Sequence, residues 1–201
     1  MLEFEKKVML TEREYCFLRD NRYQSGTDTL QVNHYYDTDD FELSKKGITC
    51  RIREKDGIYT ATVKAHQYKG ADCSVENSRH VVDQYDDFLF KGMNAAYQGC
   101  LETVRCTFVT ENGISVMLDE NHYLGIVDYE LEIEYKADAE DSALNELDAI
   151  ESDLVHSGLL TDVNVFRLRI GQGKNKSARF FNRKVEIMLK KGSDNSEVYS
   201  A

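Results

Sequence analysis

The chain has 201 residues, of which 30% are charged and 41% hydrophobic, a composition typical of one soluble globular domain. Its formal net charge of −11 argues against nucleic acid as a partner, so any anion must bind in a local basic cavity. The five cysteines are widely spaced without a C-x-x-C pair, which indicates neither a disulfide framework nor a zinc site. No apolar run approaches the ~20 residues of a membrane helix, and the charged start is unlike a signal peptide, so we expect a cytoplasmic protein without a membrane partner.

The first half of the chain reads mainly as strands. Residues 2–10 alternate between apolar and charged side chains and predict a strand. Thr11 and Glu14 form a capping box, which predicts a helix to about Asn21. Next we expect a strand at 29–36, a polar turn with a short helical piece at 37–47, a hairpin at 48–66 turned at Asp56–Gly57, and a strand at 74–82.

The second half adds a further hairpin and the clearest helix. We expect a short helix at 83–93, helix or loop up to 100, a hairpin at 101–120 turned at Asn112–Gly113, and a strand at 122–135. Residues 138–158 predict a helix capped by Gly158, with apolar positions at Leu144, Leu147, Ile150 and Leu154. So many antiparallel hairpins in one β-dominated α+β domain favour a closed or nearly closed barrel.

Charged side chains gather on one face of the predicted strands, because alternate residues of a strand share a face. These shared faces carry Glu3, Glu5 and Lys7; Arg51, Arg53 and Lys55; Thr62, Lys64 and His66; Thr103, Arg105 and Thr107; Ser115, Met117 and Asp119; and Glu130, Glu132 and Glu134. On any single strand, this pattern is more typical of a sheet whose polar face meets water. Repeated from strand to strand, it favours a barrel with a charged lumen and an apolar outer face.

A lumen rich in Arg and Lys is costly when empty, since like charges repel and burial removes their hydration. Guanidinium groups match phosphate oxygens through paired donors. Carboxylates in the same cavity would repel a phosphate chain unless a cation lay between them, and Mg²⁺ takes one or two carboxylates together with phosphate oxygens. The residues therefore predict a phosphate chain and a divalent cation in one cavity.

The ordered motifs resemble those of the CYTH domain, also called the triphosphate tunnel metalloenzyme family. The matching segments are E-x-E-x-K at residues 3–7, HYYDT at 34–38, GITCRIR at 47–53, TATVK at 60–64, VRCTF at 104–108, SVMLD at 115–119, YELEIE at 129–134 and KNKSARFF at 174–181. This resemblance implies a closed, eight-stranded antiparallel β-barrel tunnel with helices packed outside. It places the CYTH domain at 1–183 and leaves 184–201 as a C-terminal extension that we expect to be partly disordered.

The resemblance also implies residue roles. The expected triphosphate ligands are Lys7, Arg51, Arg53, Lys64, Arg105 and Lys176, and the expected ligands of Mg²⁺ or Mn²⁺ are Glu3, Glu5, Asp119, Glu130 and Glu132. Lys7, Lys64 and Asp119 are the expected catalytic residues. We expect Lys55 and Lys174 to be solvated, His34 and His66 to be structural, and Glu134 to lie at the tunnel mouth. The family often carries R-x-E-x-E on the strand after the TVK lysine, where this chain offers only Glu76.

The leading functional hypothesis is a metal-dependent triphosphatase, with inorganic tripolyphosphate or a related organic triphosphate as its small-molecule substrate. An adenylyl cyclase of the same family, which forms cyclic AMP and pyrophosphate from ATP, is the first alternative. A module that binds polyphosphate or a nucleotide without turnover is the second. A homodimer is compatible with an uncovered outer barrel face, but no sequence feature marks an interface.

Overall fold

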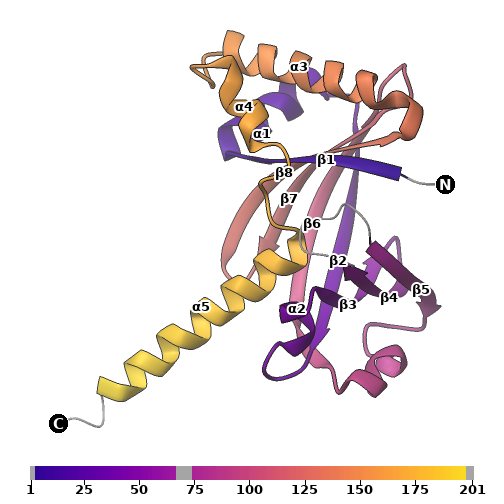
Figure 1. Ribbon diagram of the computed structural model, residues 1–201, viewed down its shortest axis with the longest axis vertical. Helices are drawn as coiled ribbons and strands as arrows, with labels where there is room; N and C mark the ends of the chain where they lie inside the picture. Colours follow the sequence, from indigo (N-terminus) through magenta and orange to yellow (C-terminus); the bar gives the residue numbers. More distant parts are fainter. Residues whose placement is uncertain (1–2, 67–73, 198–201) are drawn as a thin grey trace. The chain divides into compact units, whose positions relative to one another are not determined.

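A computed structural model describes residues 3–66 and 74–197 of the chain (Figure 1). The fold is α+β and dominated by an eight-stranded antiparallel sheet with the strand order β1-β8-β7-β6-β2-β3-β4-β5. The strands are β1 (Glu3–Leu10), β2 (Thr27–Asp37), β3 (Ile48–Lys55), β4 (Ile58–His66), β5 (Ser74–Val81), β6 (Ala96–Val109), β7 (Ser115–Tyr123) and β8 (Ile126–Lys136). The α-helices are α1 (Glu12–Phe17), α2 (Glu42–Lys45), α3 (Glu140–His156), α4 (Val163–Arg169) and α5 (Lys176–Glu197).

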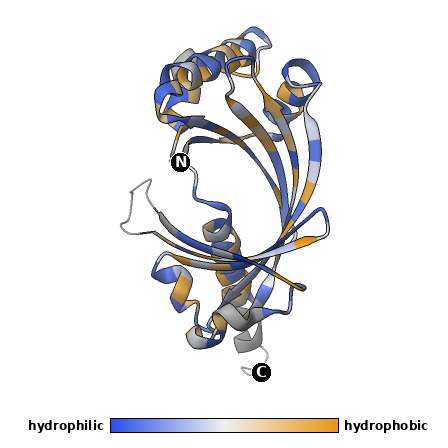
Figure 2. Ribbon diagram, turned by 90° about the vertical axis from the view of Figure 1, so that its right-hand side faces the viewer, coloured by the Kyte–Doolittle hydropathy of each residue, from blue (hydrophilic) through white to orange (hydrophobic). Residues whose placement is uncertain are grey.

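The strand order confirms the expected sheet but not its closure into a barrel. β1 and β5 stand at the two ends of the order, so hydrogen bonds among the described residues do not close the sheet. Hydrophobic residues alternate with hydrophilic ones along many of its strands (Figure 2). Across residues 3–66 and 74–197, no helix has both the length and the apolar character that crossing a bilayer requires.

The chain divides into two compact units. The first unit comprises Met1–Gln31, Glu102–His122 and Ile126–Gly173, and the second comprises Val32–Leu101, Tyr123–Gly125 and Lys174–Ala201. Each unit has its own hydrophobic cluster.

In the first unit, one face of the strands packs against helices. Val8, Leu118, Leu131 and Ile133 supply the strand side of this core, and Leu147, Ile150, Leu154 and Phe166 supply the helix side. The predicted helix is confirmed as α3, and Gly158 follows it with a positive φ of 73°. One predicted core position is wrong: Leu144 is 41% exposed, and Ala143 beside it is buried instead.

The capping box at the start of α1 is confirmed. The Glu14 backbone N–H donates to the Thr11 hydroxyl, and the Thr11 backbone N–H donates to the Glu14 carboxylate. After Phe17 the chain continues as a π-helix (η1, Leu18–Arg22) and not as α-helix. The Arg22 guanidinium contacts Glu146 at 3.0 Å and Asp153 at 2.6 Å, so it ties this turn to α3.

In the second unit, the predicted hairpin is confirmed as β3–β4. Asp56 and Gly57 both have positive φ angles, 52° and 73°, as a tight turn between twisted strands requires. The cluster of this unit is built from Cys50, Ile52, Ala61, Phe90, Tyr36 and Leu43. Residues 87–93 form a 3₁₀ helix (η2, Asp87–Met93) where a short helix was expected.

Two expectations about strand boundaries are wrong. Residues 96–100 were expected to be helical or looped, but β6 already begins at Ala96. The single strand expected at 122–135 is interrupted by a turn at Leu124–Gly125, so His122 and Tyr123 belong to β7. The last helix, α5, runs through Arg183 to Glu197, and a domain boundary at 183 remains a prediction.

Candidate functional site

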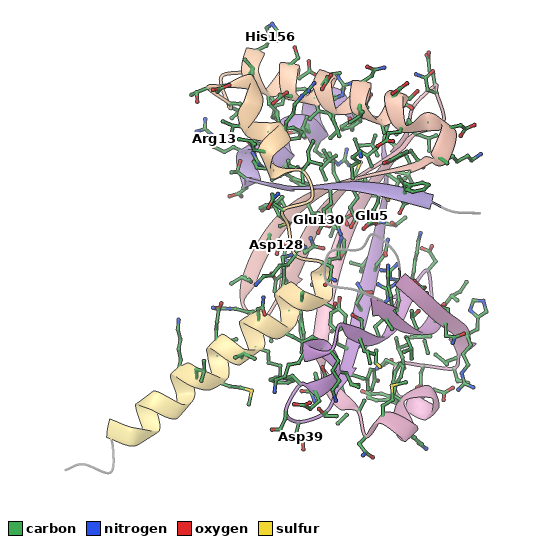
Figure 3. All side chains as sticks on the ribbon, in the orientation of Figure 1. Glu5, Arg13, Asp39, Asp128, Glu130 and His156 are labelled. Carbon is green, nitrogen blue, oxygen red and sulfur yellow. The ribbon has the colours of Figure 1, made fainter. Side chains whose placement is uncertain are left out.

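Buried charges converge on Lys7 in the first unit. The Lys7 ammonium lies 3.0 Å from Glu130 Oε1, 3.1 Å from Glu132 Oε1 and 3.7 Å from Glu5 Oε1. This follows from the strand register, because Lys7 of β1 stands opposite Glu132 of β8 and beside Glu130. Figure 3 labels Glu5 and Glu130 on these two strands. Glu130 is completely buried and Glu132 is 7% exposed, whereas Glu5, another predicted metal ligand, is exposed.

Arg105 of β6 extends this cluster. Its guanidinium binds Asp119 through two donors, Nε at 2.7 Å and Nη2 at 2.6 Å, and Nη2 also contacts Glu132 at 2.5 Å. Arg105 and Asp119 are paired across β6 and β7, and Asp119 is completely buried. We refer to Lys7, Arg105, Asp119, Glu130 and Glu132 as the Lys7–Arg105 cluster.

The cluster keeps its two cations charged. Burial alone would lower the pKa of Lys7, but Glu132, Glu130 and Glu5 outweigh it and raise that pKa. Burial likewise opposes the charge of Arg105, and Asp119 and Glu132 raise its pKa in turn. The buried carboxylates are therefore balanced in part by fixed cations of the chain.

A second buried polar group lies on the same strands. The Thr103 hydroxyl donates to Asn121 Oδ1 at 2.8 Å, and Asn121 Nδ2 donates to Asp128 Oδ1 at 3.0 Å. Thr103 and Asn121 are 1% and 0% exposed. Sequence reasoning did not single out Asn121 or Asp128. The alternation already used would have found them, since Asn121 is two positions from Asp119 and Asp128 is two from Glu130.

The second unit contains a pocket over β3, β4 and β5 of about 450 Å³. Its lining residues are Arg51, Arg53, Lys55, Asp56, Ile58, Thr60, Thr62, Glu76 and Ser78. Lys55 is exposed, as expected, and it also lines the pocket with Arg51 and Arg53. Lys64 stands opposite Thr49 and Glu76 in the register, on the face of pocket residue Thr62. Among the residues that the structure describes, neither Arg51 nor Lys64 forms an ion pair.

The charges of four basic residues of the second unit act on buried Tyr35. Burial raises the pKa of Tyr35, and the charges of Arg51, Lys176, Arg53 and Arg179 oppose this shift. The Tyr35 ring packs against Phe180 and Phe181 of α5, with centroid distances of 4.9 and 5.8 Å. The Thr49 and Ser177 hydroxyls, 2.9 Å apart, tie β3 to the start of α5. Lys176 belongs to the same unit as Arg51 and Arg53, and its predicted role as a phosphate ligand remains a prediction.

Asn33 fixes the orientation of Arg53. The Arg53 Nε–H donates to Asn33 Oδ1 at 2.9 Å, and Asn33 is only 1% exposed. A buried amide that holds Nε leaves the guanidinium plane in one orientation beside Arg51. Asn33 is a further residue that sequence reasoning did not select, although it lies on the strand next to the HYYDT motif.

The other residues that the sequence analysis singled out lie outside the Lys7–Arg105 cluster and the pocket. The imidazole of His34 lies 3.9 Å from Glu54, and Lys174 is exposed. Glu134 stands opposite Glu5 in the β1–β8 pairing, two pairs from the end formed by Glu3 and Lys136. The side chains of Glu3 and His66 lie outside the described residues, so their predicted roles remain predictions.

The chemistry of the donors fits a hard divalent cation. The carboxylate oxygens of Asp119, Glu130 and Glu132 are the ligand type that Mg²⁺ and Mn²⁺ prefer. In the described part of the chain, no three His, Cys, Asp or Glu side chains already stand as a ready-made metal site. Because Mg²⁺ usually takes only one or two carboxylates with waters and substrate phosphates, a pair such as Glu130 and Glu132 suffices.

Comparisons with known proteins identify the family of this chain. The CYTH domain model matches residues 1–159. The Bacillus subtilis (strain 168) protein named "Putative triphosphatase YjbK" is 35% identical over 148 residues, which cover 66% of this chain and 77% of that protein. A crystal structure of a "putative adenylate cyclase" from Bacillus halodurans is 25% identical, covers 90% of this chain and 97% of its own, and has a TM-score of 0.65. The Hippeastrum protein HpAC1 has the same fold, with 17% identity, coverage of 90% and 96%, and a TM-score of 0.62. The chain therefore belongs to the CYTH domain family.

Proposed function

We propose that this chain is a metal-dependent triphosphatase that hydrolyses inorganic tripolyphosphate or a related organic triphosphate. The observation that carries the proposal is the Lys7–Arg105 cluster, with completely buried Asp119 and Glu130. Burying several charges costs free energy, because the charges lose their hydration, whereas apolar side chains at the same positions would not have this cost. Such a cluster is therefore better explained by binding and chemistry than by stability. The similarity to the Bacillus subtilis protein named as a triphosphatase supports the same activity.

The basic and acidic residues have different tasks in this proposal. Arg51, Arg53, Lys64 and Lys176 bind phosphate oxygens, with Arg53 oriented by Asn33. Lys7 and Arg105 hold the carboxylates in place and contact the substrate. Asp119, Glu130 and Glu132, with Glu3 and Glu5, would hold Mg²⁺ or Mn²⁺. Such an ion neutralises phosphate charge and activates the attacking water when it is bound.

The closed tunnel is also part of this proposal. The family resemblance implies that the sheet encloses its charged face around the substrate. A closed lumen would exclude water from the charged groups and strengthen their interaction with phosphate.

A substrate panel with released phosphate as the readout tests the activity. We expect turnover of tripolyphosphate that needs Mg²⁺ or Mn²⁺, and a loss of at least about 100-fold in Lys64→Ala if Lys64 contacts the reacting phosphate. Lys45→Ala is the matched control, because Lys45 is an exposed lysine on α2. Full turnover in Lys64→Ala would contradict the assigned site. Tight triphosphate binding without any product would instead indicate a binding module.

An adenylyl cyclase is the second candidate, since the Bacillus halodurans relative carries that name. This reaction places the ribose 3′-oxygen, and not water, in line with the α-phosphate. Incubation with ATP and Mn²⁺ separates the two. Cyclic AMP with pyrophosphate as products would establish the cyclase, whereas free phosphate without cyclic AMP would establish the triphosphatase.

A further inference from the structure

One apolar residue interrupts the charged face of the first unit. Alternation along β7 places Met117 on the same face as Ser115 and Asp119, and Met117 is only 4% exposed. Its sulfur lies 2.9 Å from Nη1 of Arg105, the residue that stands opposite Asp119 in the β6–β7 pairing. Met117 thus contacts a cation of the Lys7–Arg105 cluster without being charged itself.

The hydrogen bonds of Arg105 leave one of its nitrogens for a ligand. An arginine side chain has five N–H donors. In Arg105, Nε and Nη2 both donate to Asp119, and Nη2 also donates to Glu132. The two other hydrogens are on Nη1, whose hydrogen-bond contact among the described residues is the Met117 sulfur. A phosphate oxygen can therefore reach Arg105 through Nη1 while all three bonds to carboxylates persist.

The chemistry of the thioether suits this position. A methionine sulfur is only a weak acceptor, so a phosphate oxygen can replace it at Nη1 at low cost. An amide or carboxylate oxygen at the same place would hold Nη1 much more strongly. An aliphatic side chain would offer the buried N–H no acceptor at all. The methionine side chain is also unbranched and adaptable, so it can move away from Nη1 with little loss of packing.

We propose that Met117 is a positioning residue, which keeps Nη1 of Arg105 weakly engaged and therefore available to a phosphate oxygen. The inference rests on the proposed triphosphatase function and specifies how Arg105 contacts the substrate. Asp119 and Glu132 fix the guanidinium through Nε and Nη2, so Arg105 binds phosphate end-on through Nη1. This differs from the paired donation that a guanidinium without carboxylate partners offers to phosphate.

Two substitutions of Met117 test this role in opposite ways. The readouts are kcat and KM for tripolyphosphate with Mg²⁺, and the Kd of a triphosphate analogue with hydrolysis-resistant P–NH–P bridges, measured by isothermal titration calorimetry with Mg²⁺. We expect Met117→Gln to raise KM and Kd at least about fivefold, because phosphate must then displace an amide oxygen from Nη1. Its kcat should change by less than about twofold, as for a loss of uniform binding. Met117→Leu should give KM and Kd values at or below those of the wild type, because no acceptor then competes with phosphate.

A matched control and a double variant separate this role from packing. Met188→Gln, at a methionine of α5 that is 52% exposed, should leave kcat, KM and Kd unchanged. If Met117 acts through Arg105, adding Met117→Gln to Arg105→Lys should raise Kd by less than about twofold further, because lysine has no Nη1. Circular dichroism spectra verify that each variant folds.

The outcomes distinguish the inference from the activity. If Met117→Leu weakens binding as much as Met117→Gln does, Met117 acts by packing and the inference is wrong, whether or not the wild type is a triphosphatase. Equal Kd values for the wild type and Met117→Gln would also overturn the inference. A wild type that binds the analogue without hydrolysing any triphosphate would refute the triphosphatase alone, because Kd does not depend on turnover. A wild type that neither binds nor hydrolyses would refute both.

Discussion

At the scale of single residues, Asp37 shows why a charged side chain stands in the HYYDT segment. Asp37 is completely buried at the end of β2 and accepts backbone N–H groups from Thr38 at 2.7 Å and from Leu43 and Ser44 at 2.9 Å. These N–H groups belong to the first turn of α2 and to the turn that precedes it. In that preceding turn Phe41 has a left-handed φ of 58°. The role of Asp37 is thus to hold the loop that leads into β3 and its arginines.

Removing this carboxylate leaves buried donors without an acceptor. We therefore expect Asp37→Ala to lower the free energy of unfolding by about 2–4 kcal/mol, measured by urea denaturation followed by circular dichroism. Asp39→Ala, at an exposed position of the same turn that Figure 3 labels, should change it by less than about 0.5 kcal/mol. Equal effects of the two substitutions would show that the buried N–H groups do not depend on Asp37.

At the scale of elements, Glu14 joins three parts of the first unit. The Arg169 guanidinium of α4 binds both carboxylate oxygens of Glu14 at 2.8 and 2.9 Å, and the Thr11 backbone N–H donates to the same carboxylate. Arg169 also donates to the Met9 carbonyl of β1. Burial raises the pKa of the Glu14 carboxyl, but Arg169 and Thr11 outweigh it and hold that pKa below its usual range.

This shift makes the contribution of Glu14 to stability depend on pH. A carboxyl whose pKa is lower in the folded state stabilises the fold above its unfolded pKa, and this contribution is lost as the pH falls through the folded pKa. We expect Glu14→Gln to cost about 1–3 kcal/mol at neutral pH, and the difference from wild type to shrink progressively below pH ~4. Urea denaturation at a series of pH values measures this, with exposed Glu12→Gln as the control. A difference that stays constant down to pH ~2 would contradict the assignment.

Local chemistry explains which elements could be predicted from the sequence. The capping box at Thr11 and the Asp56–Gly57 turn depend on neighbouring residues and are confirmed. The turn at Leu124 was not expected, because a leucine with a φ of 46° carries no turn signal of its own. The strand start at Ala96 depends on partners far along the chain, which alternation within one segment does not reveal.

In the candidate site, too, features set by neighbouring residues were predicted, and features set by distant partners were not. Alternation identified the charged face, so Lys7, Arg105, Glu130 and Glu132 were expected to share it, and the structure brings them into contact. Alternation also placed Lys55 on one face with Arg51 and Arg53, and all three line the pocket. The orientation of Arg53 by Asn33 was not expected, because it depends on which strands are neighbours and on side-chain directions, which spacing along one strand does not specify.

At the scale of the whole molecule, the negative net charge of the chain disfavours binding of the proposed anionic substrate. The chain carries −11 at neutral pH, and a triphosphate is itself a polyanion, so long-range electrostatics disfavour their encounter. Binding must therefore depend on local cations, of which Lys7 and Arg105 are already engaged by carboxylates. A divalent cation held by those carboxylates would reverse the local sign of the charge and bring phosphate oxygens within reach.

This balance predicts that tripolyphosphate binding itself, and not only turnover, requires a metal ion. In isothermal titration calorimetry of the full chain, we expect removal of metal with EDTA to weaken tripolyphosphate binding by at least about tenfold, since several kcal/mol of repulsion between the carboxylates and phosphate is then uncompensated. Adding back Mg²⁺ or Mn²⁺ in excess of EDTA should restore the affinity.

Glu130→Gln should bind the metal ion more weakly, because it removes one buried carboxylate of the proposed set. Equal tripolyphosphate affinities with and without metal would mean that the chain's own cations bind the phosphates, and that the acidic strand does not hold the ion.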